Sequence, residues 1–278
     1  MNVPPGFANS YNVQLLLERP QLLNRDALLK RLEMRCGPSK PMSSDKQDFL
    51  VFFHEKYRVK FKEGEVPVQS MISIHDKPLE TQALAPALQQ TWDWEGAQAA
   101  TQKHRASLMV SDLMGSGLPY KDRLRLFHNV VLSVMELVPC LAIVWSASDK
   151  LIEPSAYLDT KKPERYDPLF PAINVRLFRI QNRQEGEMVM DTLGLAALGV
   201  PDLQCHFTGL EPNAMARILY NSAYYLFENG DVINDGETIQ GIQKTDRWRC
   251  QHEMALVNPE REVLDLNPGK PYAAGERD

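Results

Sequence analysis

Short β-prone runs and amphipathic helices alternate irregularly along this chain of 278 residues, and this order limits the folds open to it. Residues 48–55, 57–64 and 66–76 are three consecutive β-rich segments, as expected of neighbouring antiparallel strands. Regular βαβ winding would instead place a helix after nearly every strand. We therefore predict an α+β fold, with a mixed, mainly antiparallel sheet or sheets packed with helices.

Three segments have the periodicity of amphipathic helices. Residues 24–35 begin at the potential cap Asn24, and residues 211–229 form another. The clearest apolar stripe lies in residues 120–138, where apolar positions recur at intervals of three and four. Its members are Leu124, Phe127, Val131, Val134 and Val138. We expect this helix to pack on a central strand from the continuously apolar run CLAIVWSAS, residues 140–148.

The sequence suggests two halves within one compact unit. Residues 1–150 form an N-terminal α/β half, and residues 172–278 form a C-terminal half. Between them, residues 151–171 are rich in proline and charge, which favours a long surface loop or a boundary. Two strand-like runs open the second half and are joined near Glu185, and we expect a loose polar tail from Pro268. No sequence repeat is visible, so a structural duplication producing two similar halves is left open.

Composition and charge exclude several classes of protein. The hydrophobic share of 44% and the charged share of 24% are those of an ordinary globular chain. A net charge of -5 without a long basic run argues against direct binding to nucleic acid. No run approaches the roughly 20 apolar residues of a membrane helix, and the N-terminus lacks the pattern of a signal peptide. We therefore expect a cytoplasmic protein.

Catalytic and metal-binding motifs are missing from the sequence. It contains no GxSxG, HExxH, GxxxxGK or GxGxxG pattern, and its four cysteines are far apart. We therefore expect no catalytic residue, no metal site and no cofactor. The alternative is an enzyme or a small-ligand-binding protein with a site assembled from distant residues, for which His128, His206 and His252 are the candidates.

Asp231, Asp235 and Glu237 form an acidic cluster near the end of the third predicted helix. Carboxylates on turns are typical calcium ligands, but the spacing of these three does not fit an EF-hand loop. We prefer roles in helix termination and turn formation, and in an exposed acidic rim that contacts a partner.

A second candidate contact surface lies in residues 92–95. Trp92, Asp93, Trp94 and Glu95 bring aromatic and acidic side chains together, as in an interface anchor with a charged rim. The structural alternative is packing of the tryptophans across a loop.

Two strings in the last third of the chain carry a family resemblance. The strings are TLGLAALGVPDLQC, residues 192–205, and NSAYYLFENGDVINDGETIQG, residues 221–241. Together they closely resemble the family called domain of unknown function 4261. The resemblance supplies a related fold but no established enzymatic activity or cofactor to carry over to this chain. Some bacterial proteins of this kind are found beside secreted toxins, which raises the hypothesis of an immunity protein.

These observations lead to the expectation of a non-enzymatic binding protein. Its partner would be a cognate toxin delivered by a type VI or related secretion system and acting in the cytoplasm, such as a basic nuclease domain. The acidic balance of the chain would speed its encounter with a basic partner.

Overall fold

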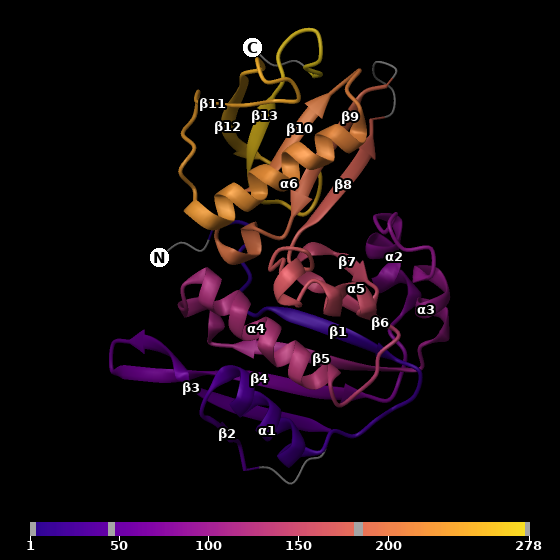
Figure 1. Ribbon diagram of the computed structural model, residues 1–278, viewed down its shortest axis with the longest axis vertical. Coiled ribbons are helices and arrows are strands. Elements are labelled where there is room, and N and C mark those ends of the chain that lie inside the picture. The colour runs from indigo at the N-terminus through magenta and orange to yellow at the C-terminus, as the bar shows by residue number, and fades with distance from the viewer. Residues whose placement is uncertain (1–3, 44–47, 181–185, 276–278) are drawn as a thin grey trace. The chain divides into compact units, whose positions relative to one another are not determined.

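A computed structural model describes residues 4–43, 48–180 and 186–275, and Figure 1 shows its two sheets with their helices. The chain divides into two compact units, residues 8–172 and residues 1–7 with 173–278, which are described separately below. Each unit contains one sheet, and antiparallel pairing predominates in both. The predicted α+β class is therefore confirmed.

The unit 8–172 is built on a seven-stranded sheet in which every neighbouring pair of strands is antiparallel. In spatial order its strands are β2 (Ser39–Pro41), β3 (Phe49–Phe61), β4 (Gly64–His75), β5 (Ala106–Leu113), β1 (Asn12–Leu17), β6 (Ala142–Trp145) and β7 (Lys150–Ile152). The long hairpin of β3 and β4 follows the pattern expected of consecutive antiparallel strands.

Five α-helices accompany this sheet in the described residues. They are α1 (Arg25–Cys36), α2 (Thr81–Gln89), α3 (Ala97–Lys103), α4 (Tyr120–Met135) and α5 (Pro154–Asp159). α1 begins where predicted, because the side chain of Asn24 accepts a hydrogen bond from the backbone N–H of Ala27 over 2.9 Å. The apolar stripe of α4 is buried as predicted, and Phe127 meets Trp145 of β6 edge to face.

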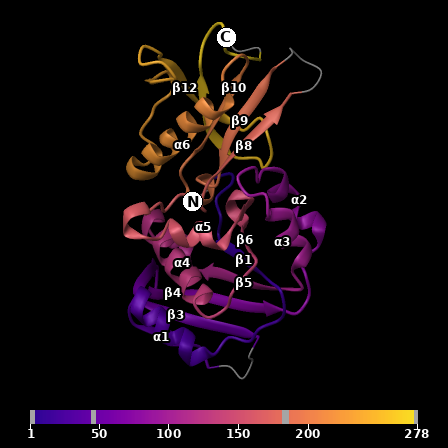
Figure 2. The ribbon, with the colours of Figure 1, turned by 45° about the vertical axis from the view of Figure 1, so that its right-hand side comes forward.

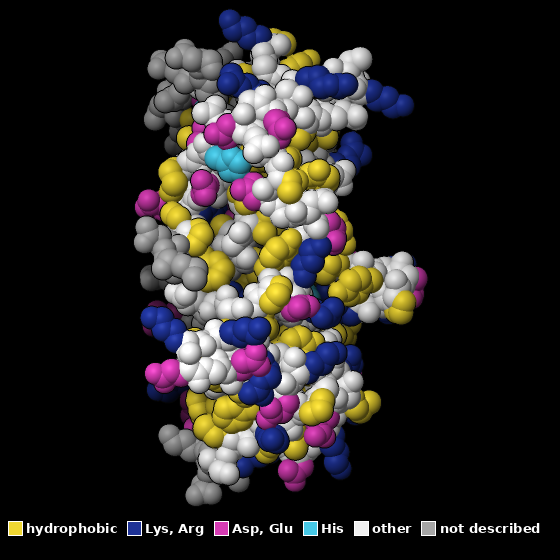
Figure 3. Space-filling view, turned by 90° about the vertical axis from the view of Figure 1, so that its left-hand side faces the viewer, with side chains coloured by type: hydrophobic (Ala, Val, Ile, Leu, Met, Phe, Trp, Pro, Cys, Tyr) yellow, Lys and Arg dark blue, Asp and Glu magenta, His cyan; other side chains and the backbone are white. Residues whose placement is uncertain are grey.

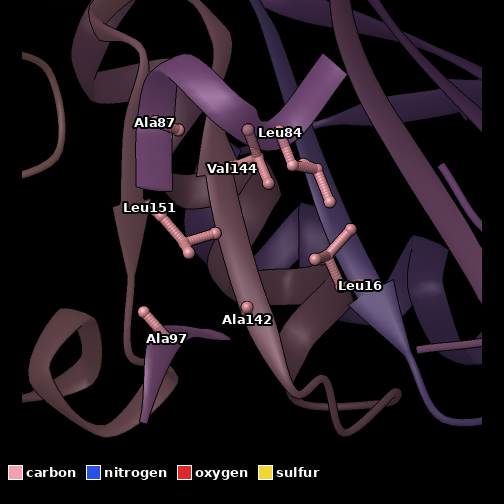
Figure 4. Packing of buried hydrophobic residues seen from close by; sticks show 7 residues of the cluster. All are labelled: Leu16, Leu84, Ala87, Ala97, Ala142, Val144 and Leu151. Carbon is pink, nitrogen blue, oxygen red and sulfur yellow. The ribbon is translucent and has the colours of Figure 1, made fainter. Parts of the chain in front are cut away.

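Neighbouring residues on β6 point to opposite faces of the sheet. Trp145 meets α4, whereas Val144 belongs to a small cluster under α2 and α3. Figure 4 shows Leu84 and Ala87 of α2 beside strand residues of this cluster. Both faces of β6 are therefore covered, as its apolar run predicted.

Two sequence expectations about this unit need correction. Residues 48–55 and 57–64 were expected as separate strands, but residues 49–61 form the single strand β3. The pairing of β3 with β4 shifts register between His54 and Arg58. Such an irregularity lets one strand continue across a break in the alternation of apolar and polar residues. Residues 151–171, expected as a long surface loop or a boundary, contain most of β7 and all of α5, and the division between the two compact units follows residue 172.

The unit that includes residues 173–278 contains a six-stranded sheet. In spatial order its strands are β11 (Thr238–Ile239), β12 (Trp248–Met254), β13 (Glu262–Asn267), β10 (Asp202–Phe207), β9 (Met188–Leu193) and β8 (Asn174–Arg179). Only the pairing of β10 with β13 is parallel. The helix α6 (Pro212–Asn229) packs on this sheet, as Figure 2 shows, and it ends at Gly230, whose φ is 81°.

Residues 262–275 differ from what the sequence suggested. β13 was not recognised as a strand, and residues 268–275 of the expected loose tail instead return to β10. The backbone of Ala273 bridges Phe207, and Thr208 donates its N–H to the carbonyl of Tyr272 over 2.9 Å. The residue proposed as the hairpin junction, Glu185, lies outside the described residues.

Candidate functional site

An open groove of about 840 Å³ lies along one side of α6. One wall is a single stripe of α6, whose members recur at helical intervals: Ile218, Asn221, Ser222 and Tyr225. The other wall is formed by the chain after the helix, namely Val232, Ile233 and residues 236–241, which include β11. This volume falls in the range of about 300–1,000 Å³ that is typical of ligand sites.

His252 on β12 brings two of the predicted acidic residues together beside this groove. Its Nδ1 lies 2.7 Å from Asp235 Oδ1, and its Nε2 lies 3.1 Å from Asp231 Oδ1. The backbone N–H of His252 also donates to Asp235 Oδ1 over 2.7 Å. Since both carboxylates belong to the segment between α6 and β11, this Asp231–His252–Asp235 cluster fastens one wall of the groove to β12.

The cluster favours the protonated form of His252. Partial burial alone would lower the pKa of His252, but hydrogen bonds to Asp235 and Asp231 outweigh it and raise that pKa above its usual value. The backbone N–H and the imidazole of His252 in turn lower the pKa of Asp235. A protonated imidazole donates from both nitrogens, so in this arrangement His252 has no lone pair with which to act as a base.

This geometry gives a direct expectation for the titration of His252. Its pKa, followed by NMR through the imidazole carbon protons, should lie above the ordinary histidine value of about 6.5 and should fall in an Asp235→Asn variant. An Asp246→Asn variant is the control, because Asp246 accepts from the backbone of Gln243 instead. The stability that the cluster contributes is present below the unfolded-state pKa and is lost as pH rises through the raised folded-state pKa. An unchanged pKa in Asp235→Asn would disprove the coupling.

Glu237, the third residue of the predicted acidic rim, has a different position. Its Oε2 accepts from the backbone N–H of Asn234 over 2.7 Å, and the residue lines the groove. The structure therefore places Asp231 and Asp235 on His252 and places Glu237 on the groove wall.

The first resemblance string forms a buried turn around Asp202. The carboxylate of Asp202 accepts from the backbone N–H groups of Gly194 and Leu195 over 3.1 and 3.0 Å, and from Thr192 Oγ1 over 3.0 Å. Burial raises the pKa of Asp202, while Arg261 and these backbone donors oppose that shift. The first resemblance string therefore has a structural role, because the carboxylate of Asp202 holds the backbone turn at Gly194 and Leu195 in the same string.

Arg261 joins this turn to the rest of the sheet through a buried clamp, which consists of Arg176, Asp191, Asp202 and Arg261. Arg261 Nε lies 3.2 Å from Asp202 Oδ2, and its Nη2 lies 2.5 Å from Asp191 Oδ2. Arg176 binds the same Asp191 through two nitrogens, at 2.9 and 2.5 Å. Two positive and two negative side chains therefore balance in the interior, as buried charges require.

The three histidines considered as candidates for an assembled enzymatic or ligand site have different surroundings. His128 is buried between Tyr157 Oη and the carbonyl of Pro168, each 2.9 Å away, and burial lowers its pKa well below the usual value. His206 lies 2.7 Å from Glu187 Oε1 in a nearly buried pair. His128 belongs to the unit 8–172, and in the other unit His206 and His252 have different carboxylate partners.

Residues 92–95 lie between α2 and α3, and Trp94 is partly buried whereas the other three are exposed. Trp94 packs against the cluster under α2, so this tryptophan takes the structural role. Trp92 is 52% exposed, and Asp93 and Glu95 are exposed as well. The surface available here is therefore smaller than the sequence suggested.

The described residues contain neither a cluster of metal-ligating side chains nor a helix suited to span a membrane. No group of three or more His, Cys, Asp or Glu side chains there has an arrangement suited to a metal ion. No described helix has the length and apolar character needed to cross a membrane. On the face in Figure 3, acidic and basic side chains are interspersed with hydrophobic ones.

The fold and the groove define a mainly antiparallel α+β protein with an open groove between a helix and a sheet edge. Residues 191–267 match the family described as Domain of unknown function (DUF4261), which confirms the sequence resemblance. The match includes the groove and every member of the buried clamp except Arg176. No curated protein and no solved structure matched the chain.

Proposed function

We propose that this chain is a non-enzymatic protein that acts by stoichiometric binding, with the groove beside α6 as its main contact surface. The observation that carries the proposal is the open groove, whose walls present Tyr225 and Val232 with 52% and 46% of their surface exposed. Aromatic and aliphatic side chains on an open surface are typical anchors of protein interfaces. The neighbouring His252 is already engaged by two carboxylates, which fits a binding role better than a catalytic one.

The proposed partner is a basic protein. Glu237 lines the groove, Asp231 and Asp235 lie beside it, and the whole chain has a net charge of -5. A partner with a positive patch would be attracted to this surface over a distance set by the ionic strength. In its most specific form, the proposal is that the chain is an immunity protein for a secreted bacterial toxin, such as a nuclease acting in the cytoplasm.

Variants of the two candidate surfaces test where binding occurs. The partner tested is the product of the gene that neighbours the gene for this chain, and affinity is measured by titration calorimetry. Tyr225→Ala with Glu237→Gln should weaken binding at least about tenfold, because an interface tyrosine commonly dominates its contact. Trp92→Ala with Asp93→Ala tests the second surface.

A matched control pair is Tyr166→Ala with Glu164→Gln, which removes an exposed tyrosine and an exposed acid elsewhere. This pair should leave affinity within about twofold, as substitutions outside a contact do. If only the Trp92 and Asp93 variant weakens binding, the contact lies between α2 and α3 and the groove assignment is wrong. If the unaltered chain binds no such toxin and gives no protection at any dose, the immunity proposal itself fails.

A further inference from the structure

We propose that the groove binds an extended, cationic segment of the partner, which adds to the outer edge of β11 as a seventh strand of this sheet. This inference rests on the proposed binding function and specifies the chemistry of the bound segment. It combines three observations: an open sheet edge, a helix stripe facing the same groove, and an acidic stretch of chain without a basic residue.

The first observation is the position of β11 at the end of the described six-stranded sheet. On its inner side, the carbonyl of Glu237 accepts from the N–H of Cys250 over 2.8 Å. Backbone groups of successive strand residues point to alternate sides. The N–H and C=O of Thr238 are therefore directed away from β12, where another strand can pair with them.

The second observation is that this edge runs along the groove. All six consecutive residues 236–241 line it, with the two-residue strand β11 among them. The facing α6 stripe ends in the exposed Tyr225. A strand added to β11 would therefore pair its backbone on one side and place alternate side chains against α6.

This wall is held in place before any ligand arrives. The Asp231–His252–Asp235 cluster fastens the preceding loop, and Gly241 lies directly on the indole of Trp248. A Cβ built on Gly241 would come within 2.3 Å of that ring, so only glycine fits there. A fixed edge reduces the conformational entropy lost on binding.

The third observation is the negative charge of the chain around the groove, which favours a cationic segment of the partner. Residues 228–240 contain four acids, Glu228, Asp231, Asp235 and Glu237, and no lysine or arginine. Natural sheet edges are often protected from pairing by lysine, and this edge has none. A lysine- or arginine-containing strand is the complement that this surface favours over an acidic one.

A designed peptide tests the inference on the full-length protein. The probe is the acetylated and amidated heptapeptide Lys-Val-Thr-Val-Thr-Val-Lys, and binding is followed by NMR of the ¹⁵N-labelled chain. The largest amide shifts should occur in residues 236–241. N-methylation of alternate residues along one edge of the peptide, or replacement of both lysines by glutamate, should weaken binding at least fivefold.

The protein offers a matched pair of variants at one position. Thr238→Pro removes the outward N–H, and proline is tolerated on a strand edge that faces solvent. Thr238→Val keeps that N–H and should bind as the unaltered chain does. With unchanged thermal melts, Thr238→Pro should weaken binding of both the peptide and the toxin at least fivefold relative to Thr238→Val.

The outcomes separate this inference from the proposed function. If the toxin binds Thr238→Pro and Thr238→Val equally well, strand addition is wrong and the binding function stands. If the peptide gives no shift in residues 236–241 at millimolar concentration, or binds equally when N-methylated, the edge is not the site. If sedimentation shows that Thr238→Pro abolishes a dimer of the free chain, the edge pairs with a second copy and the inference is overturned.

Discussion

Replacing Arg261 with methionine is expected to destabilise the unit that contains residues 173–278 by about 3–5 kcal/mol, the range for breaking a buried ion pair. The substitution keeps most of the side-chain volume but leaves Asp202 without its ionic partner in the interior. Asp191 remains paired with Arg176, so most of the loss in the free energy of unfolding should come from Asp202 and the turn that its carboxylate holds. The free energy of unfolding is measured by denaturant titration, with hydrogen exchange of β9 and β10 amides to assign the loss to this unit.

The pH dependence of the Arg261→Met variant adds a second readout. Without Arg261, burial should raise the pKa of Asp202 further than in the unaltered chain, because the opposing charge is gone. Protonation would then remove the uncompensated charge, so the stability deficit should be smaller at pH 5 than at pH 8. Arg247→Met is the control, since Arg247 is exposed and donates to the backbone carbonyls of Lys244 and Asp246 in its own loop. Equal stability of both variants would show that the clamp contributes nothing.

Replacing Val131 with aspartate should disrupt the other unit, residues 8–172. Val131 is fully buried on α4, in the stripe that packs beside Phe127 and the sheet. An isolated carboxylate in this position has no partner, so we expect a loss of several kcal/mol or failure to fold. The measurement is the free energy of unfolding of the full chain, with hydrogen exchange of β1 and β5 amides as the local readout.

Val131→Ala separates the effect of volume from that of charge. The alanine variant removes two methyl groups and should cost about 1–3 kcal/mol, in proportion to larger truncations of buried side chains. The aspartate variant should be clearly worse because it adds the unpaired charge. A near-normal melt for Val131→Asp would contradict the buried position of this stripe.

The fold was predictable where its signals are local. α4 and α6 follow from apolar periodicity, and the start of α1 follows from the cap at Asn24. The continuous strand β3 was not predicted, because the break at residues 55–57 resembles a turn and a bulge leaves no clear local signal. β13 was missed because six residues of mixed character become a strand only by pairing with β10 and β12.

The candidate site depends on contacts that sequence spacing does not reveal. Asp231 and Asp235 were recognised as a cluster, but their partner His252 lies 21 and 17 residues further along the chain. Arg261 lies 70 residues from Asp191, so the buried clamp had no local signature either. A single sequence indicates which residues could carry charge, whereas the sheet topology determines which of them meet.

The stoichiometry of protection tests the binding proposal most directly. Purified chain is titrated into a fixed concentration of the cognate toxin, well above the dissociation constant, and the remaining toxin activity is measured. The proposal predicts a linear loss of activity that ends at one equivalent, with the same endpoint after prolonged incubation. Complete protection at far below one equivalent, growing with time, would mean that the chain turns over a substrate and would contradict the proposal.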